Sequence, residues 1–395
     1  MSYDFETLVP RRGQGSNKWN AMYEADPTVG DDIVPFSIAD MEFANAPEIA
    51  AGVGEYLSRT VLGYASPTDS YLAAVCGWMG RRHGWRVEPE WIVDYPGVVP
   101  ALFHLARLLA APGEGIILMT PVYYPFYDAV RKGGRTICEC PLVERGGRYE
   151  IDFEALERAC ANPRNRALFL CSPHNPVGRV WSRDELERVA KICLAHDVVV
   201  VSDEIHADLV MPGHIHVPFA CVSEEAAQSC IVCTAPSKTF NTAGLMTSNL
   251  VIPNADLRER VRAFRTDQAI FSCNTAGYAA CEVAYTKCEG WLDELLVVLE
   301  RNRQLVECFV AERLPQLRVV PLEGTYLQWI DCRGLGLSAD ELERFMVGEA
   351  RLFLDEGKVF GKVGEGFERL NIACPTWVLE SALERLAAAV ERRGL

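Results

Sequence analysis

The sequence predicts an α/β protein, with a large domain built on a mostly parallel (mixed) central sheet flanked by helices, and a smaller α+β C-terminal domain. Two observations lead to this prediction. Short, continuously apolar runs alternate with helical patterns through the middle of the chain, and the pattern changes from about residue 290 onward. Because parallel strands are covered on both faces, they read as unbroken apolar runs and not as alternating ones.

The strands of the large domain are predicted from apolar runs between residues 92 and 253. They are a strand near 92–94, GIILMT (115–120), ALFLCSP (167–173), VVVVSDEI (198–205), SCIVCTA (229–235) and SNLVIP (248–253). The segment SRDELERVAKICLAH (182–196) has the spacing of an amphipathic helix. Ser182 and Glu185 predict a capping box at its start.

The sequence pattern after residue 290 predicts a second domain. A long helix (291–313) leads to the strand-like segment RVVPLEGTYLQWIDC, two more helices and the apolar segment FERLNIAC. We therefore expect a large domain over residues 51–289 and a small C-terminal domain over 290–395. The first fifty residues are expected to be irregular and to pack on the small domain.

Composition excludes several classes of function. The net charge of −15 argues against nucleic acid or an anionic membrane as the main partner. The sequence has no run of about 18 apolar residues, so no membrane-spanning helix is expected. The start, MSYDFETLVPRR, lacks the apolar stretch of a signal peptide. Fifteen scattered cysteines, many of them in apolar runs, predict buried thiols in a reducing cytoplasm. The pair Cys138 and Cys140 has no second pair or nearby histidine, so no metal is expected.

Polar and aromatic residues follow the predicted strands where they end. These residues are the turn Gly97-Val98-Val99, Tyr123, Asn175, Asp203, His206, Ser237 and Lys238. Parallel sheets bind ligands beyond the carboxyl ends of their strands, so we expect these groups to meet in one site.

This set of groups matches the needs of pyridoxal 5′-phosphate (PLP). The aldehyde of PLP needs an amine, which Lys238 supplies, and its ring nitrogen needs a buried carboxylate such as Asp203 to stay protonated. The Asn175 amide suits the phenolate oxygen, and Tyr123 suits the ring face. The turn 97–99 offers the backbone N–H groups of a helix N-terminus to the phosphate.

Each of these residues alone also has a plainer interpretation. A lysine after a strand is usually a solvated surface residue, and Asp203 alone could cap a turn. Asn175 precedes a proline, which is an ordinary turn signal. Tyr123 could be a core aromatic, and His206 a satisfied buried histidine. The prediction of a PLP site therefore depends on the order and spacing of the whole set.

That order and spacing resemble the fold-type I PLP enzymes of the class I/II aminotransferase superfamily, which have the aspartate-aminotransferase fold. The resemblance runs nearly end to end, through FSIADMEFANAPEI, LGYASPTDSYLAAVCGWM, YPGVVPAL, TPVYYPFY, CSPHNPVGRVW, VSDEIHADLV, APSKTFNTAGL, GTYLQWID and GEGFERLNIACP. The DEIH, APSKTFN and GEGF-RLN-ACP strings look most like the pyridoxal C–S lyases. This is the cystathionine β-lyase branch, which includes the maltose-regulon modulator protein.

The resemblance implies roles for the residues at the strand ends. Lys238 matches the Schiff-base lysine, Asp203 the partner of the ring nitrogen, and Asn175 the amide on the phenolate oxygen. Tyr123 matches the aromatic residue that stacks on the ring. His206 falls where the superfamily often has a tyrosine, so its role stays open.

The resemblance also implies the groups that bind the phosphate and the substrate. Val98 and Val99 match backbone amides on the phosphate, and Ser237 matches a phosphate-binding hydroxyl. Tyr64, in LGYASP, matches a tyrosine that reaches the phosphate of the neighbouring subunit, which implies a homodimer with shared active sites. Arg369, in FERLN, matches the arginine that binds the substrate α-carboxylate bidentately.

Three departures from the superfamily pattern are visible. Ala235 stands where aminotransferases often have a second phosphate-binding hydroxyl. The loop GLMTSNL lacks the arginine that many of them use on the phosphate, so fewer side chains are expected there. Thr376 follows ACP, where this branch often has arginine.

The branch that the chain resembles implies PLP-dependent β-elimination of S-substituted cysteines, which gives pyruvate, ammonia and a thiol. The same residues would serve transamination, so an aminotransferase is the alternative enzyme. A regulatory protein that binds a transcription factor with the same fold is the alternative from another class.

Overall fold

Seven strands form the large sheet of the computed structural model, which describes residues 2–395. Their order across the sheet is β1-β9-β8-β7-β6-β2-β3. The strands are β1 (Ile92–Tyr95), β2 (Gly115–Leu118), β3 (Thr136–Glu139), β6 (Asn165–Cys171), β7 (Val199–Asp203), β8 (Cys230–Thr234) and β9 (Ser248–Val251). The strands from β3 to β8 run parallel, whereas β9 is antiparallel to both β8 and β1. The predicted mostly parallel, mixed sheet is confirmed.

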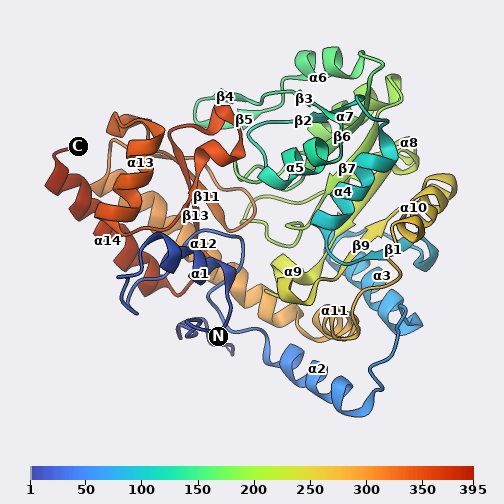
Figure 1. Cartoon of the computed structure of the whole chain (residues 1–395), viewed down its shortest axis with the longest axis horizontal. Coiled ribbons are helices and arrows are strands. Elements are labelled where there is room, and N and C mark those ends of the chain that lie inside the picture. Colours follow the sequence, from blue (N-terminus) through green and yellow to red (C-terminus); the bar gives the residue numbers. More distant parts are fainter. Residues whose placement is uncertain (1) are drawn as a thin grey trace.

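Helices cover both faces of this sheet (Figure 1). Successive strand residues point to opposite faces, so Ile116 and Leu118 pack on one side and Ile117 on the other. The first side is covered by α4 (Val98–Leu109), α5 (Tyr124–Lys132) and α10 (Ala255–Asp267). The second is covered by α3 (Asp69–His83), α6 (Phe153–Cys160), α7 (Arg183–Ala195), α8 (Glu224–Gln228) and α11 (Thr275–Lys287).

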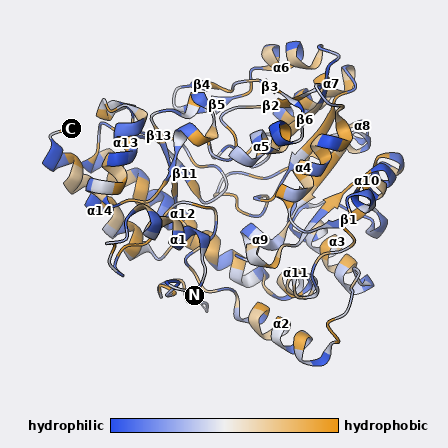
Figure 2. Cartoon of the chain, in the orientation of Figure 1, coloured by the Kyte–Doolittle hydropathy of each residue, from blue (hydrophilic) through white to orange (hydrophobic). Residues whose placement is uncertain are grey.

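Apolar residues fill the strands between these two helical layers (Figure 2). This is the two-sided burial that the unbroken apolar runs predict. The predicted capping box is also confirmed, because Ser182 and Glu185 exchange hydrogen bonds at the start of α7. A short hairpin, β4 (Val143–Arg145) and β5 (Arg148–Glu150), lies outside the large sheet.

A second, antiparallel sheet lies in the C-terminal part of the chain. Its strands are β10 (Arg318–Val319), β11 (Leu327–Asp331), β13 (Phe367–Asn371) and β12 (Asp355–Glu356), in that spatial order. The helices of this part are α12 (Glu289–Arg313), α13 (Ala339–Phe345) and α14 (Thr376–Arg393). The long helix and the strand in FERLN agree with the sequence prediction.

The first fifty residues are more regular than predicted. Helix α1 (Asn17–Ala25) forms where an irregular segment was expected, and α2 (Pro47–Arg59) follows. Trp19 and Met22, three residues apart, are both buried and give α1 its apolar face. Between the two helices, the chain crosses the small sheet, where the Asn371 N–H donates to the Phe36 carbonyl. Among residues 2–395, no helix is both long and apolar enough to span a membrane.

Candidate functional site

The register of the central strands brings three of the predicted residues to one edge of the large sheet. Asp203, the last residue of β7, lies opposite Cys171 of β6 and Cys233 of β8. Asn175 follows Cys171 by four positions, and Lys238 follows Cys233 by five, on the short helix α9 (Pro236–Thr239). The three functional groups therefore leave aligned strands at the same end.

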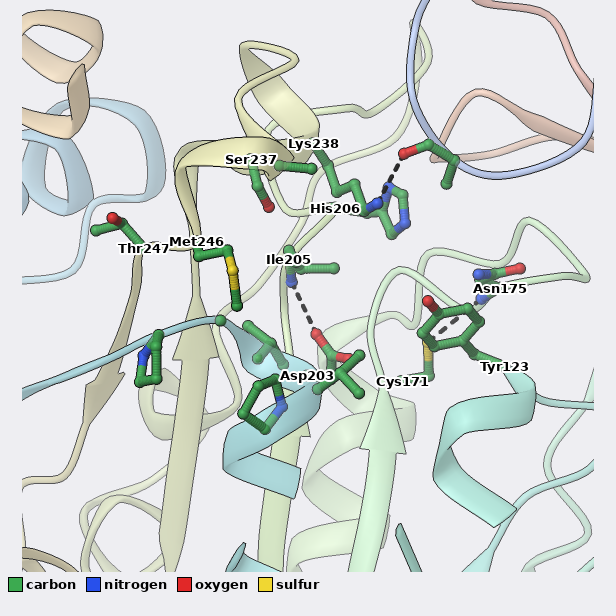
Figure 3. Close-up of a pocket in the computed structure, with 17 residues that line it drawn as sticks. Tyr123, Cys171, Asn175, Asp203, Ile205, His206, Ser237, Lys238, Met246 and Thr247 are labelled. Atoms are coloured by element: carbon green, nitrogen blue, oxygen red, sulfur yellow. Dashed lines mark hydrogen bonds between the residues drawn. The ribbon is translucent and has the colours of Figure 1, made fainter. Parts of the chain in front are cut away.

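A cavity of about 200 Å³ lies at this edge (Figure 3). Its lining includes most of the predicted site residues, namely Val98, Val99, Tyr123, Asn175, Asp203, His206, Ser237 and Lys238. It also includes residues to which the sequence analysis gave no role, among them Ala39, Cys171, Ile205, Met246 and Thr247. Two predicted residues, Tyr64 and Arg369, do not line it.

The amine of Lys238 enters the cavity from α9 and donates a hydrogen bond to the Ala39 carbonyl at 2.7 Å. The side chain keeps some exposure to the cavity but is enclosed by protein. This enclosure lowers the pKa of Lys238 to about 8, because burial disfavours the ammonium form, and the charge of Asp40 opposes the shift. A lysine with this pKa supplies neutral amine near neutral pH, as a nucleophile or base requires.

Asp203 is a buried carboxyl in the same cavity. Its Oδ1 accepts the Ile205 N–H at 3.2 Å, and no cationic side chain among residues 2–395 lies within ion-pair distance. Burial raises the pKa of Asp203 to about 7, although the Ile205 N–H and the charge of Lys238 act in the opposite direction. Such a carboxyl would be stabilised by a ligand that brings its own N–H donor or positive charge.

His206 follows Asp203 along the cavity wall and is also buried. Its ring packs edge-to-face on Tyr326 at 5.8 Å between centroids, and its Nδ1 has no partner among the described residues. Burial, and then the nearby charges of Lys238 and Arg369, hold the pKa of His206 well below its usual value. The imidazole is therefore neutral beside the amine.

The start of α4 forms the other end of the cavity. Its N-cap residue is Gly97, with φ of 109°, and no side chain of residues 2–395 caps the helix. The N–H groups at Val98 and Val99 are thus available to an anion, and the dipole of the helix favours one there. Ser237 lies at the same cavity, and Ala235 contributes no hydroxyl.

Tyr123 and Asn175 form a third wall and are joined through the backbone, because the Tyr123 N–H donates to the Asn175 carbonyl at 3.1 Å. The side-chain oxygen of Asn175 accepts from Arg369 Nη1 at 3.0 Å. This fixes the orientation of the amide, whose NH₂ group stays free to donate into the cavity.

Arg369 lies on β13, behind Asn175, and is buried. Its Nη2 pairs with Asp355, which stands opposite it in the register of β12 and β13, and its Nε has no partner in the described part of the chain. The sequence analysis missed Asp355, because no pattern in a two-residue strand signals its pairing.

Tyr64 lies in the loop between α2 and α3, which can be followed in Figure 1, and it does not line the cavity. Its relative exposure is 110%, and its neighbours Val61 and Leu62 are 90% and 67% exposed. A loop with three large exposed apolar side chains is unusual for the free surface of a protein.

The comparisons with known proteins agree with this architecture. Residues 31–386 match the model of the family described as aminotransferase class I and II, and the chain belongs to this family. Cystathionine beta-lyase PatB of Bacillus subtilis (strain 168) is 40% identical over 387 residues, which are 98% of this chain and 100% of that protein. Protein MalY of Escherichia coli (strain K12) is 32% identical, over 98% of this chain and 99% of its own length.

A solved structure shows the same fold. The structure of cystalysin from Treponema denticola, which contains a PLP cofactor, superposes with a TM-score of 0.98. The two chains are 46% identical, and each is covered completely.

The cavity of this chain fits PLP by its own chemistry. It places an amine of lowered pKa, a buried carboxyl without a cation and an uncapped helix N-terminus around one space. These are the groups that an aldehyde, a ring N–H and a phosphate need.

Proposed function

We propose that this protein is a PLP-dependent carbon–sulfur lyase that acts on S-substituted cysteines and releases pyruvate, ammonia and a thiol. The observation that carries the proposal is the cavity at the aligned strand ends, where Lys238 and Asp203 have shifted pKa values. The named cystathionine β-lyases and C–S lyases among its relatives support this reaction over others of the family.

The residues of the cavity would hold PLP at three points. Lys238 Nζ would carry its aldehyde carbon, Asp203 its ring N–H, and the N–H groups of Val98 and Val99 its phosphate, together with Ser237. Asn175 and His206 would lie along the side of the ring, and Tyr123 on its face. When bound, PLP withdraws electrons from the substrate Cα, which makes the Cα proton acidic.

The chain itself supplies the proton transfer. Lys238 Nζ would take the proton from Cα, and its lowered pKa raises the fraction of neutral amine that can do so. The negative charge of Asp203 would keep a proton on the ring nitrogen and so maintain electron withdrawal. With the Cβ–S bond held in the right orientation, the thiolate would leave with the bonding electrons and take up a proton. Water would then hydrolyse the released enamine to pyruvate and ammonia.

Arg369 is the proposed site for the substrate α-carboxylate. Asn175 and Asp355 hold two of its nitrogens, and its Nε has no partner among the described residues. A buried guanidinium fixed in this way is well suited to a carboxylate that enters beside Asn175.

We also propose a homodimer in which the loop of Tyr64 reaches the partner's cavity. The exposed apolar residues of this loop support the proposal, because a second copy would cover them. Tyr64 would then add a phosphate ligand where Ala235 offers none.

A cytoplasmic role in amino-acid metabolism is the proposed setting. The support is the set of fifteen cysteines, all free and most of them buried. Free thiols in this number suit a reducing compartment.

Product analysis tests the reaction. Purified protein with PLP would be incubated with cystathionine, with cystine, and with alanine plus a 2-oxo acid. We expect pyruvate and ammonia from the first two, measured by coupling to lactate dehydrogenase, and slow transfer of the amino group in the third. Fast transamination without pyruvate from any cysteine thioether would instead make the protein an aminotransferase.

The regulatory alternative makes a different prediction. A protein that acts only by binding a transcription factor would be retained on that factor whether or not Lys238 is intact, and would turn over no amino acid. Pull-down with and without PLP, and with Lys238→Ala, separates the two.

A further inference from the structure

The acceptor of the Lys238 amine belongs to an N-terminal segment, residues 38–43, that has no helix or strand. The Ala39 carbonyl accepts from Lys238 Nζ at 2.7 Å and from the Tyr326 hydroxyl at 2.9 Å. Ile38, just before it, has φ of +33°, a conformation that a β-branched residue rarely adopts. Some other contact must therefore hold this turn in place.

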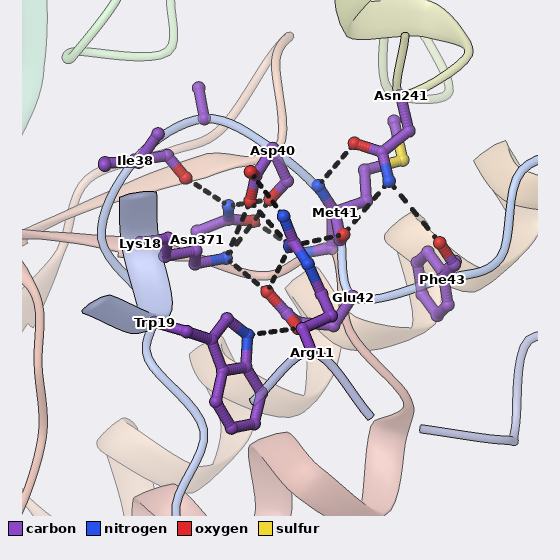
Figure 4. Close-up of polar contacts among 12 residues, drawn as sticks. Arg11, Lys18, Trp19, Ile38, Asp40, Met41, Glu42, Phe43, Asn241 and Asn371 are labelled. Atoms are coloured by element: carbon purple, nitrogen blue, oxygen red, sulfur yellow. Dashed lines mark hydrogen bonds and ion pairs between the residues drawn. The ribbon is translucent and has the colours of Figure 1, made fainter. Parts of the chain in front are cut away.

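Side chains from distant parts of the chain bond most of the carbonyls of the segment and the Met41 N–H (Figure 4). Asn371 Nδ2 donates to the carbonyls of Ile38 and Asp40 at 2.9 and 2.7 Å. Asn241, three residues beyond Lys238, accepts the Met41 N–H at 2.9 Å and donates to the Met41 carbonyl at 3.0 Å. The segment is thus tied both to β13 and to the loop that follows α9, the helix that carries the lysine.

Two carboxylates of the segment, Asp40 and Glu42, are paired with Arg11 and Lys18 from the N-terminal part of the chain. Arg11 makes a fork with the Asp40 carboxylate at 3.1 and 2.9 Å and also pairs with Glu42 at 3.0 Å. Lys18 pairs with Glu42 at 3.0 Å and donates to the Asp40 carbonyl at 3.1 Å. Trp19 Nε1 donates to the second oxygen of Glu42 at 3.0 Å.

The cluster of these four charges, Arg11, Lys18, Asp40 and Glu42, is costly to bury. Lys18 and Glu42 are each 1% exposed, so both have lost their water. A buried ion pair adds little net stability, but it does fix one geometry. Arg11 and Lys18 also precede residue 31, where the match to the family begins. The geometry that the cluster fixes is the turn at Ala39.

We propose that Asp40, fixed by Arg11 and Lys18, is a positioning residue for the proton-transferring amine: it holds the Ala39 carbonyl against Lys238 Nζ and places a negative charge beside that amine. The proposal rests on the proposed function of Lys238. It adds a second carboxylate, from the N-terminal segment, to the one that β7 supplies.

The charged groups around Lys238 come from four parts of the chain. Asp203 acts from the end of β7, Asp40 from the segment, Arg369 from β13 and Lys18 from α1, while His206 is a neutral neighbour. The two carboxylates raise the pKa of Lys238, and the two cations lower it. Removing the charge of Asp40 would therefore bring the pKa of the amine below about 8.

Two substitutions separate the charge of Asp40 from the position of Ala39. Asp40→Asn removes the charge, whereas Arg11→Ala keeps the charge and removes the fork, leaving Lys18 3.5 Å from Asp40. Arg12→Ala is the matched control, because within residues 2–395 the only carboxylate that pairs with Arg12 is the exposed Asp31, and its guanidinium stacks on the half-buried Tyr23.

The first measurement uses cofactor-free protein. The rate at which an amine-reactive anhydride acylates Lys238, followed by peptide mass spectrometry across pH, gives the midpoint of its titration. We expect Asp40→Asn to lower this midpoint by about half a pH unit or more, since it removes one nearby opposite charge. Arg11→Ala and Arg12→Ala should leave the midpoint unchanged.

The second measurement uses the holoenzyme with an amino acid that it turns over. We expect kcat of Arg11→Ala to fall by about threefold to tenfold with little change in KM, because a misplaced carbonyl misaligns the amine. Asp40→Asn should lower kcat similarly and move the acidic limb of the pH profile to lower pH. Arg11→Lys should recover part of the loss, and Arg12→Ala should match the wild type.

A wild-type midpoint in Asp40→Asn, or wild-type kcat in Arg11→Ala, would overturn the proposal. The acylation experiment involves no lyase chemistry. A shifted midpoint in a protein that makes no pyruvate would therefore reject the proposed reaction and keep the role of Asp40.

Discussion

The two sides of the cavity hold Lys238 in different ways. On the sheet side, Asn175 and Asp203 leave aligned strands, and the ladder of β6, β7 and β8 sets their positions. On the N-terminal side, Ala39 lies in a segment without regular structure, and ion pairs and side-chain amides hold it.

Because of this difference, substitutions on the two sides report different things: the chemistry of a side chain on the sheet side, and the position or charge around Lys238 on the N-terminal side. A side chain on the sheet side can be replaced without moving the backbone, so its loss reports the chemistry of that side chain. On the N-terminal side, the group that touches the amine is a backbone carbonyl, so a nearby substitution acts through its position or through charge.

Among substitutions on the sheet side of the cavity, Lys238→Ala should cause the largest loss of activity. We expect turnover to fall by about 10³-fold or more, because the general base is lost together with the covalent link to the cofactor. Dialysis followed by phosphate analysis should still detect weakly bound PLP. Turnover within tenfold of the wild type would contradict the proposed role of the amine.

Asp203→Asn keeps the shape of the side chain and removes its charge. We expect about a 10²-fold loss of kcat, since an amide cannot stabilise a protonated ring nitrogen as a carboxylate does. Cofactor content, measured by absorbance after gel filtration, should change much less. A normal kcat in this variant would show that the charge of Asp203 is not needed for turnover and would leave Asp203 only a structural role.

Mixing two inactive variants tests whether the cavity is shared between subunits. If Tyr64 acts in the partner's cavity, Tyr64→Ala and Lys238→Ala subunits should form hybrid dimers with one intact site each. Randomly mixed dimers would recover up to about a quarter of wild-type activity. Sedimentation showing an active monomer would contradict the dimer.

The buried carboxyl of Asp203 predicts a pH effect on the stability of cofactor-free protein. Its folded pKa of about 7 lies above the ordinary value of 3.8, so the folded state binds its proton more tightly than the unfolded state does. The stability that this group contributes is complete below pH 3.8 and is lost as pH rises through about 7. The Tm of the wild type should therefore fall relative to Asp203→Asn over this range, measured by calorimetry. Parallel curves would show that Asp203 ionises normally.

The sheet side could be predicted from the sequence, because each of its functional residues follows an apolar strand. The rule that parallel strands end at one edge placed Lys238 and Asp203 together, and the order and spacing of the whole set gave them their roles. The N-terminal side could not be predicted in this way. Arg11 and Asp40 are 29 positions apart and meet at a turn without helical or strand periodicity. The motif FSIADMEF indicated the family but not this contact.

The small sheet could be predicted only in part. FERLN was predicted as a strand and Arg369 as a site residue, but its partner Asp355 follows only from the pairing of β12 with β13. Helix α1 was missed because its nine residues carry few apolar positions, and tertiary contacts of Trp19 and Met22 stabilise it.

Borohydride reduction of the holoenzyme tests whether Lys238 holds the cofactor. We expect reduction to fix the cofactor irreversibly on one tryptic peptide, and fragmentation to place it on Lys238. Lys238→Ala should yield no such peptide. A cofactor fixed on any other lysine would contradict the assignment of this cavity as the active site.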